Sequence, residues 1–216
     1  MEHKDMMQLL DKVYAQSICG VDRVSLSVQG LAEDYLAKHP DREKAIKAFI
    51  YNQIVKCCTS GFLAGVGGAL TLPVAIPANI GSVLYVQMRM IAGLAYMGGY
   101  DPRTDQVQTL VYACLAGIAV DQVIKNAGIK VGVKMGEAMV RRILGSVLTK
   151  INQKVGFRML TKFGSKGIIN LGKAVPLVGG IIGGGFDGAE TKIIAARAYK
   201  MFIQGDLTAC DDGTEE

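Results

Sequence analysis

The feature that most constrains this chain is a run of 32 residues, 57–88, without a single Asp, Glu, Lys, Arg or His. Pro73 and Pro77 interrupt the run, and a proline inside a helix removes a backbone hydrogen bond and clashes with the preceding turn. One continuous helix is therefore not expected. We predict a helical hairpin over about 57–97, with a corner at 72–77 that contains both prolines.

Neither limb of this hairpin has the pattern of a clean transmembrane span. The first limb has roughly 16 residues and would be about 24 Å long, whereas the hydrocarbon core of a bilayer is ~30 Å thick. The second limb is long enough, but it holds Arg89, whose insertion at mid-membrane costs roughly 2.5–3.5 kcal/mol. We therefore expect a hairpin that is buried in protein or only partly inserted in lipid.

Hydrophobic periodicity predicts helices through the rest of the chain. The first third contains three amphipathic stripes: Met6, Leu9, Leu10 and Val13; Val24, Val28, Leu31 and Tyr35; and Ala45, Phe49 and Ile50 after the capping residue Asp41. A further helix is expected from Asp101-Pro102 to about Gly128, and a last one ends at Gly205. No strand pattern competes with these helices.

These patterns predict an all-α fold: a compact multi-helix bundle with a Pro-cornered apolar helical hairpin and a Gly-rich C-terminal helix. The 216 residues are enough for one domain with a large core. We assign a single helical domain to 1–205. The segment 206–216 contains five acidic residues and is predicted to be a flexible acidic tail.

A basic block lies between Lys125 and Lys173, with eleven Lys or Arg and one acidic residue. Its basic residues recur every four positions at Lys150, Lys154, Arg158, Lys162 and Lys166. In a helix this spacing places them on one face, opposite an apolar face. Such a helix favours an anionic partner such as lipid headgroups, and the alternative is a solvated face balanced by acids elsewhere. Nucleic acid is not expected, because few aromatic residues are interleaved with the charges.

Glycines recur at i, i+4 spacing in three tracts: Gly61/Gly65, Gly128/Gly132/Gly136 and Gly180/Gly184/Gly188. This spacing allows another backbone to approach a helix closely. The tracts predict either helix pairing within a membrane or around an acyl chain, or close packing in a soluble core. The candidate residues for a lipid or apolar-ligand pocket are Gly61, Gly65, Leu72, Pro73, Pro77, Gly180 and Gly184.

Patterns typical of catalysis or metal binding are absent from the sequence. The chain has only two His, His3 and His39, and no HExxH, GxSxG or phosphate-loop motif. Gly183-x-Gly185-x-x-Gly188 lacks the βαβ surroundings of a dinucleotide site. We predict no catalytic residues, no cofactor and no metal. Five Cys without a CxxC pair indicate free thiols in a reducing cytosol.

Three charged residues lie in or beside apolar surroundings and are candidates for buried charges: Arg89, Asp101 and Asp187. A buried charge is costly unless it is paired. We therefore expect Arg89 to pair with Asp187 or with Asp101. Convergence of the three in one cavity would instead favour a catalytic role.

Five segments carry a resemblance to a known family. They are Ser60-Gly-Phe-Leu-Ala-Gly-Val-Gly-Gly-Ala-Leu-Thr-Leu-Pro-Val-Ala-Ile-Pro77, Gln87-x-Arg89-Met-Ile-Ala, Gly98-Gly-Tyr-Asp101, Lys173-Ala-Val-Pro-Leu-Val-Gly-Gly180 and Phe186-Asp187-x-x-x-Thr191. Over roughly 45–203 the chain resembles the EcsC family. The resemblance implies a helical, membrane-associated bacterial protein with effects linked to secretion, and it assigns no catalytic residues.

The sequence thus predicts a non-catalytic helical protein that binds lipid or an anionic membrane surface, as an accessory to membrane transport or secretion. We expect it in the cytoplasm, peripheral to or partly inserted in the inner membrane. One alternative is an enzyme that acts on a lipid or apolar substrate through buried Arg and Asp. Another is an interaction subunit of a membrane or defence complex. The sequence leaves the oligomeric state open.

Overall fold

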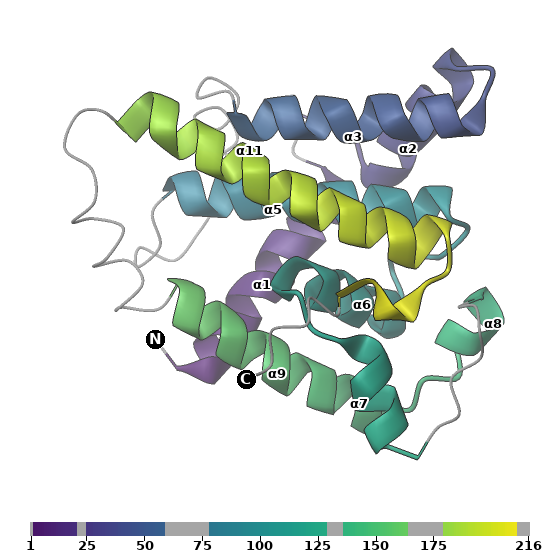
Figure 1. Ribbon diagram of the computed structural model, residues 1–216, viewed down its shortest axis with the longest axis vertical. Helices are drawn as coiled ribbons and strands as arrows, with labels where there is room; N and C mark the ends of the chain where they lie inside the picture. The colour runs from purple at the N-terminus through teal and green to yellow at the C-terminus, as the bar shows by residue number, and fades with distance from the viewer. Residues whose placement is uncertain (1, 21–24, 59–77, 129–135, 164–178, 211–216) are drawn as a thin grey trace.

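The structure is a computed structural model that describes residues 2–20, 25–58, 78–128, 136–163 and 179–210, without the side chains of 78–80 and 179–187. Within these ranges the chain forms helices joined by turns and contains no strand, which confirms the all-α prediction (Figure 1). The main helices are α1 (His3–Cys19), α2 (Val28–Lys38), α3 (Arg42–Cys58), α5 (Ala78–Met97), α6 (Asp105–Ala116), α7 (Val120–Asn126), α8 (Glu137–Val140), α9 (Gly145–Phe163) and α11 (Gly179–Ala198). A π-helical turn, η1 (Tyr199–Ile203), and a 3-10 turn, η2 (Leu207–Cys210), follow α11.

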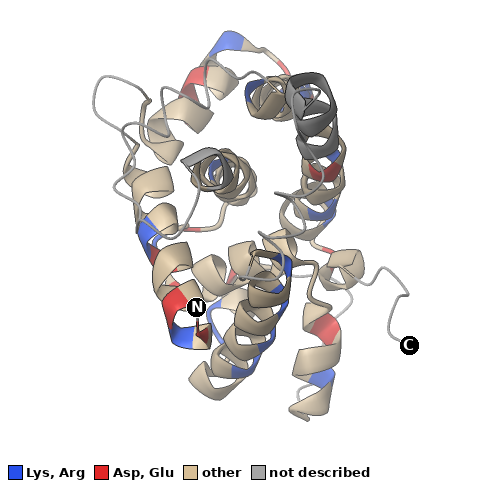
Figure 2. Cartoon of the chain, turned by 90° about the vertical axis from the view of Figure 1, so that its left-hand side faces the viewer, with Lys and Arg blue, Asp and Glu red and all other residues tan. Residues whose placement is uncertain are grey.

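Helix α5 is the central element of the bundle. It packs against α1, α2, α3, α6, α11 and η1, and Figure 2 shows it nearly end-on inside a ring of helices. From Gly81 to Met97 each of its residues is buried except Val83 and Tyr96, which are half-buried. This burial on every side explains the charge-poor sequence, because a helix that is apolar all round needs apolar neighbours all round.

The predicted second limb of the hairpin is confirmed, because α5 begins directly after Pro77 and ends at Met97. Close packing of α5 depends on small residues. A Cβ added to Gly93 would lie 2.4 Å from the ring of Phe49 on α3.

None of the described helices is long and apolar enough to cross a membrane. The first limb and the corner at 72–77 lie outside the described residues.

The three predicted N-terminal helices are present and bury most of the predicted stripes, although Tyr35 and Ile50 are half-buried and Val24 lies outside the described residues. Met6, Leu9, Leu10 and Val13 of α1 are buried, as are Val28 and Leu31 of α2 and Ala45 and Phe49 of α3. The predicted cap of α3 is also correct, because Asp41 Oδ1 accepts a hydrogen bond from the Glu43 backbone N–H at 2.8 Å. These helices follow the sequence pattern because each buries one stripe against α5 or α9.

The single helix predicted from Asp101-Pro102 to Gly128 is wrong in two respects. It begins later, at Asp105, because Thr104 is the N-cap and its side chain accepts from the Val107 backbone N–H. It is also divided into α6 and α7, because Gly117 adopts a left-handed conformation with φ 67°. A left-handed residue at this position ends a helix and is most easily supplied by glycine.

The glycine tract Gly128/Gly132/Gly136 does not form one helix face. Gly128 has φ 75° and follows α7, whereas Gly136 is the extended N-cap of α8. Gly132 lies outside the described residues. The i, i+4 spacing was therefore a misleading signal in this segment, because two of its glycines serve helix ends rather than helix packing.

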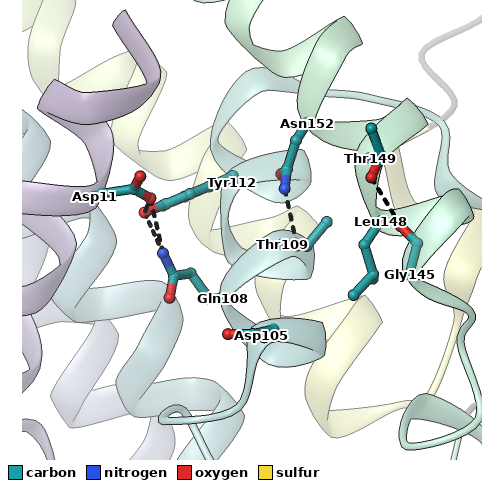
Figure 3. Close-up of a pocket in the computed structure, with 9 residues that line it drawn as sticks. All are labelled: Asp11, Asp105, Gln108, Thr109, Tyr112, Gly145, Leu148, Thr149 and Asn152. Carbon is teal, nitrogen blue, oxygen red and sulfur yellow. Dashed lines mark hydrogen bonds between the residues drawn. The ribbon is translucent and has the colours of Figure 1, made fainter. Parts of the chain in front are cut away.

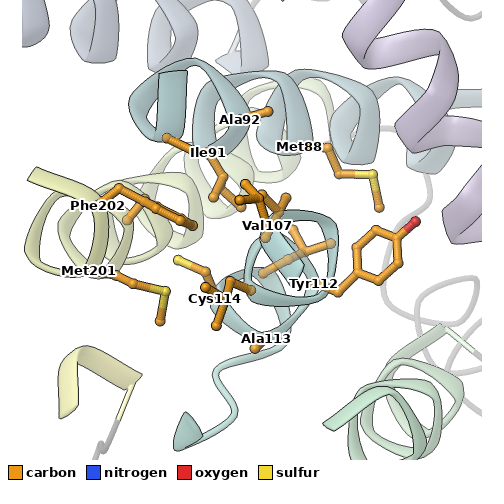
Figure 4. Packing of buried hydrophobic residues seen from close by; sticks show 14 of the residues in the cluster. Met88, Ile91, Ala92, Val107, Tyr112, Ala113, Cys114, Met201 and Phe202 are labelled. Atoms are coloured by element: carbon orange, nitrogen blue, oxygen red, sulfur yellow. The ribbon is translucent and has the colours of Figure 1, made fainter. Parts of the chain in front are cut away.

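The hydrophobic core is continuous from α5 through α6 to η1. Figure 4 shows Met88 and Ile91 of α5 extending toward α6, where Val107 lies between the two helices, with Met201 and Phe202 of η1 on the side of Cys114. On the other side of α6, the rings of Tyr14 and Tyr112 pack edge to face with centroids 5.5 Å apart. Helix α9 adds Val147, Ile151, Val155 and Met159 to the same core and packs on α1, α6 and α7.

Candidate functional site

The predicted basic helix is present as α9, and its two faces have different roles. Val147, Ile151, Val155 and Met159 are buried in the core. Lys150 and Lys154 point into solvent on the opposite side and form no ion pair with any described residue. The apolar face of α9 is thus used by the fold itself, and the solvent-exposed face is the one that a partner could reach.

Two other basic residues of the predicted stripe take part in internal contacts. Arg158 Nη1 donates to the carbonyl oxygen of Gly117 at 2.9 Å, where α6 ends. Lys162 forms an ion pair with Glu190 of α11. Both lie near the border between the exposed and buried faces, so they hold α9 against its neighbours. Lys166 lies outside the described residues.

A large apolar side chain is exposed beside these two solvent-facing lysines. Phe157 is 71% exposed and lies on the same face of α9 as Lys150 and Lys154. Leu144, 59% exposed, precedes the helix and follows the exposed Arg142. We call Lys150, Lys154 and Phe157 the α9 face. Its signal in the sequence is the position of Phe157, seven residues after Lys150 and therefore on the same side of a helix.

Arg89 is buried as predicted, with 2% of its surface exposed. Its guanidinium donates to the Ser17 carbonyl at 3.1 Å, to the Tyr85 hydroxyl at 3.4 Å and to the Leu26 carbonyl. Burial lowers the pKa of Arg89, and burial together with the charge of Arg89 lowers the pKa of Lys56 on α3. The arginine therefore fastens the end of α1 and the segment before α2 to the central helix.

The predicted pairing of Arg89 with Asp101 is wrong. Asp101 is exposed, so it is not a buried charge, and its Oδ1 accepts from the Arg103 backbone N–H at 3.0 Å in the turn before α6. Arg89 instead uses neutral acceptors among the described residues. Asp187 belongs to α11, but its side chain is outside the described set, so pairing with it remains a prediction.

The residues proposed for a lipid pocket are placed only in part. Gly61, Gly65, Leu72, Pro73 and Pro77 lie outside the described residues. Gly180 and Gly184 are in the first half of α11, as the predicted Gly-rich C-terminal helix requires. Gly188, the last glycine of the Gly180/Gly184/Gly188 tract, packs against α3. A Cβ added to Gly188 would lie 2.7 Å from Cys58 Sγ, so α11 and α3 are in close contact there.

A pocket of about 430 Å³ lies between α1, α6 and α9 (Figure 3). Its lining is mostly polar and comprises Asp11, Asp105, Gln108, Thr109, Tyr112, Gly145, Leu148, Thr149 and Asn152. Thr109, Tyr112 and Leu148 are buried, whereas Asp11, Asp105 and Thr149 are exposed. Sequence reasoning missed this site, because its residues come from three helices that are distant in the chain and match no motif.

The two carboxylates in this pocket are held differently. Asp11 Oδ1 accepts from Gln108 Nε2 and from the Tyr112 hydroxyl, both at 2.9 Å. Burial, and then the charge of Asp11, raise the pKa of Tyr112, so the phenol stays protonated and keeps donating. Asp105 is in the first turn of α6, where a negative charge is favourable. The pocket thus keeps negative charge beside hydroxyl and amide groups.

Asn152 forms another part of the pocket lining. Its Nδ2 donates to Thr109 Oγ1 at 3.3 Å, but its Oδ1 is buried without a hydrogen-bond partner. A buried carbonyl without a donor costs about 1–3 kcal/mol. Native proteins rarely leave such an atom unsatisfied unless water or a ligand completes it.

The five cysteines are free thiols. Cys57, Cys114 and Cys210 are buried, and Cys19 and Cys58 are exposed. Burial raises the pKa of the Cys114 thiol, whose Sγ donates to the Ile194 carbonyl at 3.8 Å. In the described part of the chain, no group of three or more His, Cys, Asp or Glu is arranged to hold a metal ion.

Comparisons of the chain with protein-family models, with curated proteins and with solved structures find no match.

Proposed function

We propose that this protein binds reversibly to an anionic membrane surface through the α9 face. The observation that carries the proposal is the combination of Lys150 and Lys154 with Phe157 on one exposed side of a helix. Basic residues are attracted to anionic headgroups. An aromatic ring beside the basic residues can enter the boundary between headgroups and acyl chains. A single exposed aromatic side chain is common on protein surfaces, so the proposal rests on its position beside two solvent-exposed lysines.

The mode of attachment follows from the burial of α9. An amphipathic helix that lies in the membrane plane normally buries its apolar face in lipid. In this protein that face packs against α1, α6 and α7 and is occupied. The proposed contact is therefore a docking of the folded protein, with the two lysines at the headgroups and the Phe157 side chain inserted between the headgroups.

Elementary energetics make this contact weak and salt-sensitive. Each Lys or Arg near an anionic surface contributes about 1 kcal/mol, and burial of a phenylalanine side chain contributes about 1.5–3 kcal/mol. Two lysines and one phenylalanine thus give roughly 4 kcal/mol, which corresponds to a dissociation constant on the order of 1 mM. Screening shortens the range of the attraction to about 8 Å at physiological ionic strength.

The family and cellular setting belong to the same proposal. The likeness to the EcsC family rests on the sequence segments given above, and a role beside membrane transport or secretion in the cytoplasm follows from that likeness. A lipid pocket built from the first limb of the hairpin and the glycines of α11 stays a prediction. Helix α5 itself packs against other helices of the same chain, and its described side chains are buried among them.

The test uses vesicles of phosphatidylglycerol and phosphatidylcholine at low salt and measures the bound fraction by co-sedimentation. We expect the double variant Lys150→Glu/Lys154→Glu to bind anionic vesicles at least tenfold more weakly than the wild type. Phe157→Ala should weaken binding about tenfold or more without changing its dependence on salt. Pure phosphatidylcholine vesicles should bind weakly in every case.

The matched control is Lys44→Glu/Lys192→Glu. It changes the net charge by the same amount at exposed positions on α3 and α11 and should leave most of the binding intact. An equal loss in this control would show that net charge, and not the α9 face, attracts the protein. If both double variants bind anionic vesicles as well as the wild type does, the proposal is rejected.

A further inference from the structure

The pocket between α1, α6 and α9 has a charge that differs from that of the whole protein. Its nine lining residues include two carboxylates, Asp11 and Asp105, and no Lys, Arg or His. The chain as a whole carries a net charge of +5, and the neighbouring face of α9 is basic. A positive ligand would therefore be held by local contacts against the overall field, and not by general attraction.

The polar atoms of the pocket favour a ligand that donates hydrogen bonds. Asp11 and Asp105 offer carboxylate oxygens, and Thr149 offers a hydroxyl at the rim. Asn152 Oδ1 is a buried acceptor without a partner. Gln108 and Tyr112 use their donors to orient Asp11. The groups left for a ligand are thus mainly acceptors.

The size of the pocket indicates a small organic molecule. About 430 Å³ exceeds the space of a single ion and falls within the range of roughly 300–1,000 Å³ typical of small-molecule sites. Leu148 supplies a buried apolar wall against which a short carbon chain can lie. The remaining lining is polar, which suits a ligand with polar groups at both ends.

We propose that this pocket binds a small organic cation with an ammonium group and a second N–H or O–H donor, in the class of diamines and amino alcohols. The ammonium group lies between Asp11 and Asp105, where charge-assisted hydrogen bonds are stronger than neutral ones. The second donor forms a hydrogen bond to Asn152 Oδ1. This proposal does not depend on membrane docking, because it uses a different side of α9.

The test compares three probes of similar length on the full-length protein by isothermal titration calorimetry: 1,4-diaminobutane, 1,4-butanediol and succinate. We expect binding of the diamine with a dissociation constant below about 1 mM, and no measurable binding of the neutral diol or the dianion. Asp11→Asn/Asp105→Asn should weaken diamine binding at least tenfold. The control Glu33→Gln/Asp34→Asn, with the same change in charge on α2, should leave it unchanged.

Asn152→Asp separates a specific site from general electrostatics. It replaces the unpaired carbonyl with a carboxylate, so it should tighten binding of the diamine more than binding of a monoamine of the same length. Equal binding of the three probes, or loss of diamine binding in the Glu33/Asp34 control, would overturn the proposal. Circular dichroism of each variant shows whether the fold is retained.

A vesicle experiment distinguishes the two sources of such an ammonium group. Phosphatidylethanolamine is added to phosphatidylglycerol vesicles, and binding of the wild type is compared with that of Asp11→Asn/Asp105→Asn. If phosphatidylethanolamine tightens vesicle binding of the wild type but not of the double variant, the pocket binds a lipid headgroup. If phosphatidylethanolamine changes vesicle binding of neither protein, the ligand of the pocket is a free amine. Failure of the docking proposal is read separately, from Lys150→Glu/Lys154→Glu.

Discussion

Gln87 and Thr191 are 104 residues apart in the sequence and form a hydrogen bond in the core, with Gln87 Nε2 donating to Thr191 Oγ1 at 3.1 Å. Both side chains are buried, so the bond joins the central helix α5 to α11. The two residues belong to two separate segments of the EcsC resemblance. Their contact gives those segments a shared structural role, which is the attachment of the C-terminal helix to the middle of the bundle.

Thr191→Val is expected to destabilise the fold by about 1–3 kcal/mol, because it leaves the Gln87 amide as a buried donor without this acceptor. The free energy of unfolding is measured by urea titration. The double variant Gln87→Leu/Thr191→Val should be less destabilised than Thr191→Val, because both polar partners are then removed. Thr161→Val, an exposed control on α9, should change stability by less than about 0.5 kcal/mol.

A greater loss in the double variant than in Thr191→Val would contradict this account. It would mean that Gln87 stabilises the core through its other contacts and not through Thr191.

Gly98 lies against η1, and a Cβ added there would be only 2.2 Å from the Phe202 carbonyl oxygen. Because the neighbour is backbone and not a flexible side chain, Gly98→Ala should destabilise the protein by about 1–3 kcal/mol through overpacking. Gly145→Ala is the control, since nothing lies within 4 Å of its added Cβ. At the start of α9 it should be neutral or stabilise by about 0.4–1 kcal/mol. Thermal unfolding of the two variants measures the difference, and equal melting temperatures would refute it.

The sequence was sufficient to predict the fold class and much of the element pattern. Apolar stripes placed α1, α2 and α3, and the prolines placed the start of α5. The all-round apolar character of α5 indicated complete burial, although it did not distinguish burial in lipid from burial in protein. That choice depends on how many helices surround α5, which is a property of the tertiary arrangement and not of the local sequence.

Several errors concern residues whose partner is distant in the chain, whereas the late start of α6 and the roles of Gly128 and Gly136 are set by local helix ends. The break at Gly117 depends on a left-handed turn and on Arg158, which binds its carbonyl oxygen from α9. Asp101 seemed a plausible partner for Arg89, yet Arg89 binds backbone carbonyls near the end of α1 and just before α2. The pocket with Asp11 and Asn152 was not found, since only tertiary packing brings α1 and α9 together.

The buried tyrosines give the fold a defined response to alkaline pH. Burial is the main cause that raises the pKa values of Tyr14 and Tyr112 above the ordinary value of 10.0, and the Tyr14 hydroxyl donates to the Pro102 carbonyl at 2.7 Å. In the unfolded chain both phenols lose their protons near pH 10, whereas in the folded chain they keep them. A raised folded-state pKa contributes stability that is present below pH 10 and is lost as the pH rises further, at up to about 1.4 kcal/mol per pH unit for each group.

We therefore expect the free energy of unfolding, measured by urea titration between pH 8 and pH 11, to fall steeply above pH 10. In Tyr112→Phe the fall should be shallower, because one buried hydroxyl is gone, even if stability at pH 8 is lower. Tyr51→Phe is the matched control, since Tyr51 is largely exposed on α3 and its replacement removes no buried hydroxyl. The same slope in wild type and Tyr112→Phe would show that other groups govern the alkaline transition, and tyrosinate absorbance recorded in parallel would identify whether any tyrosine ionises before the chain unfolds.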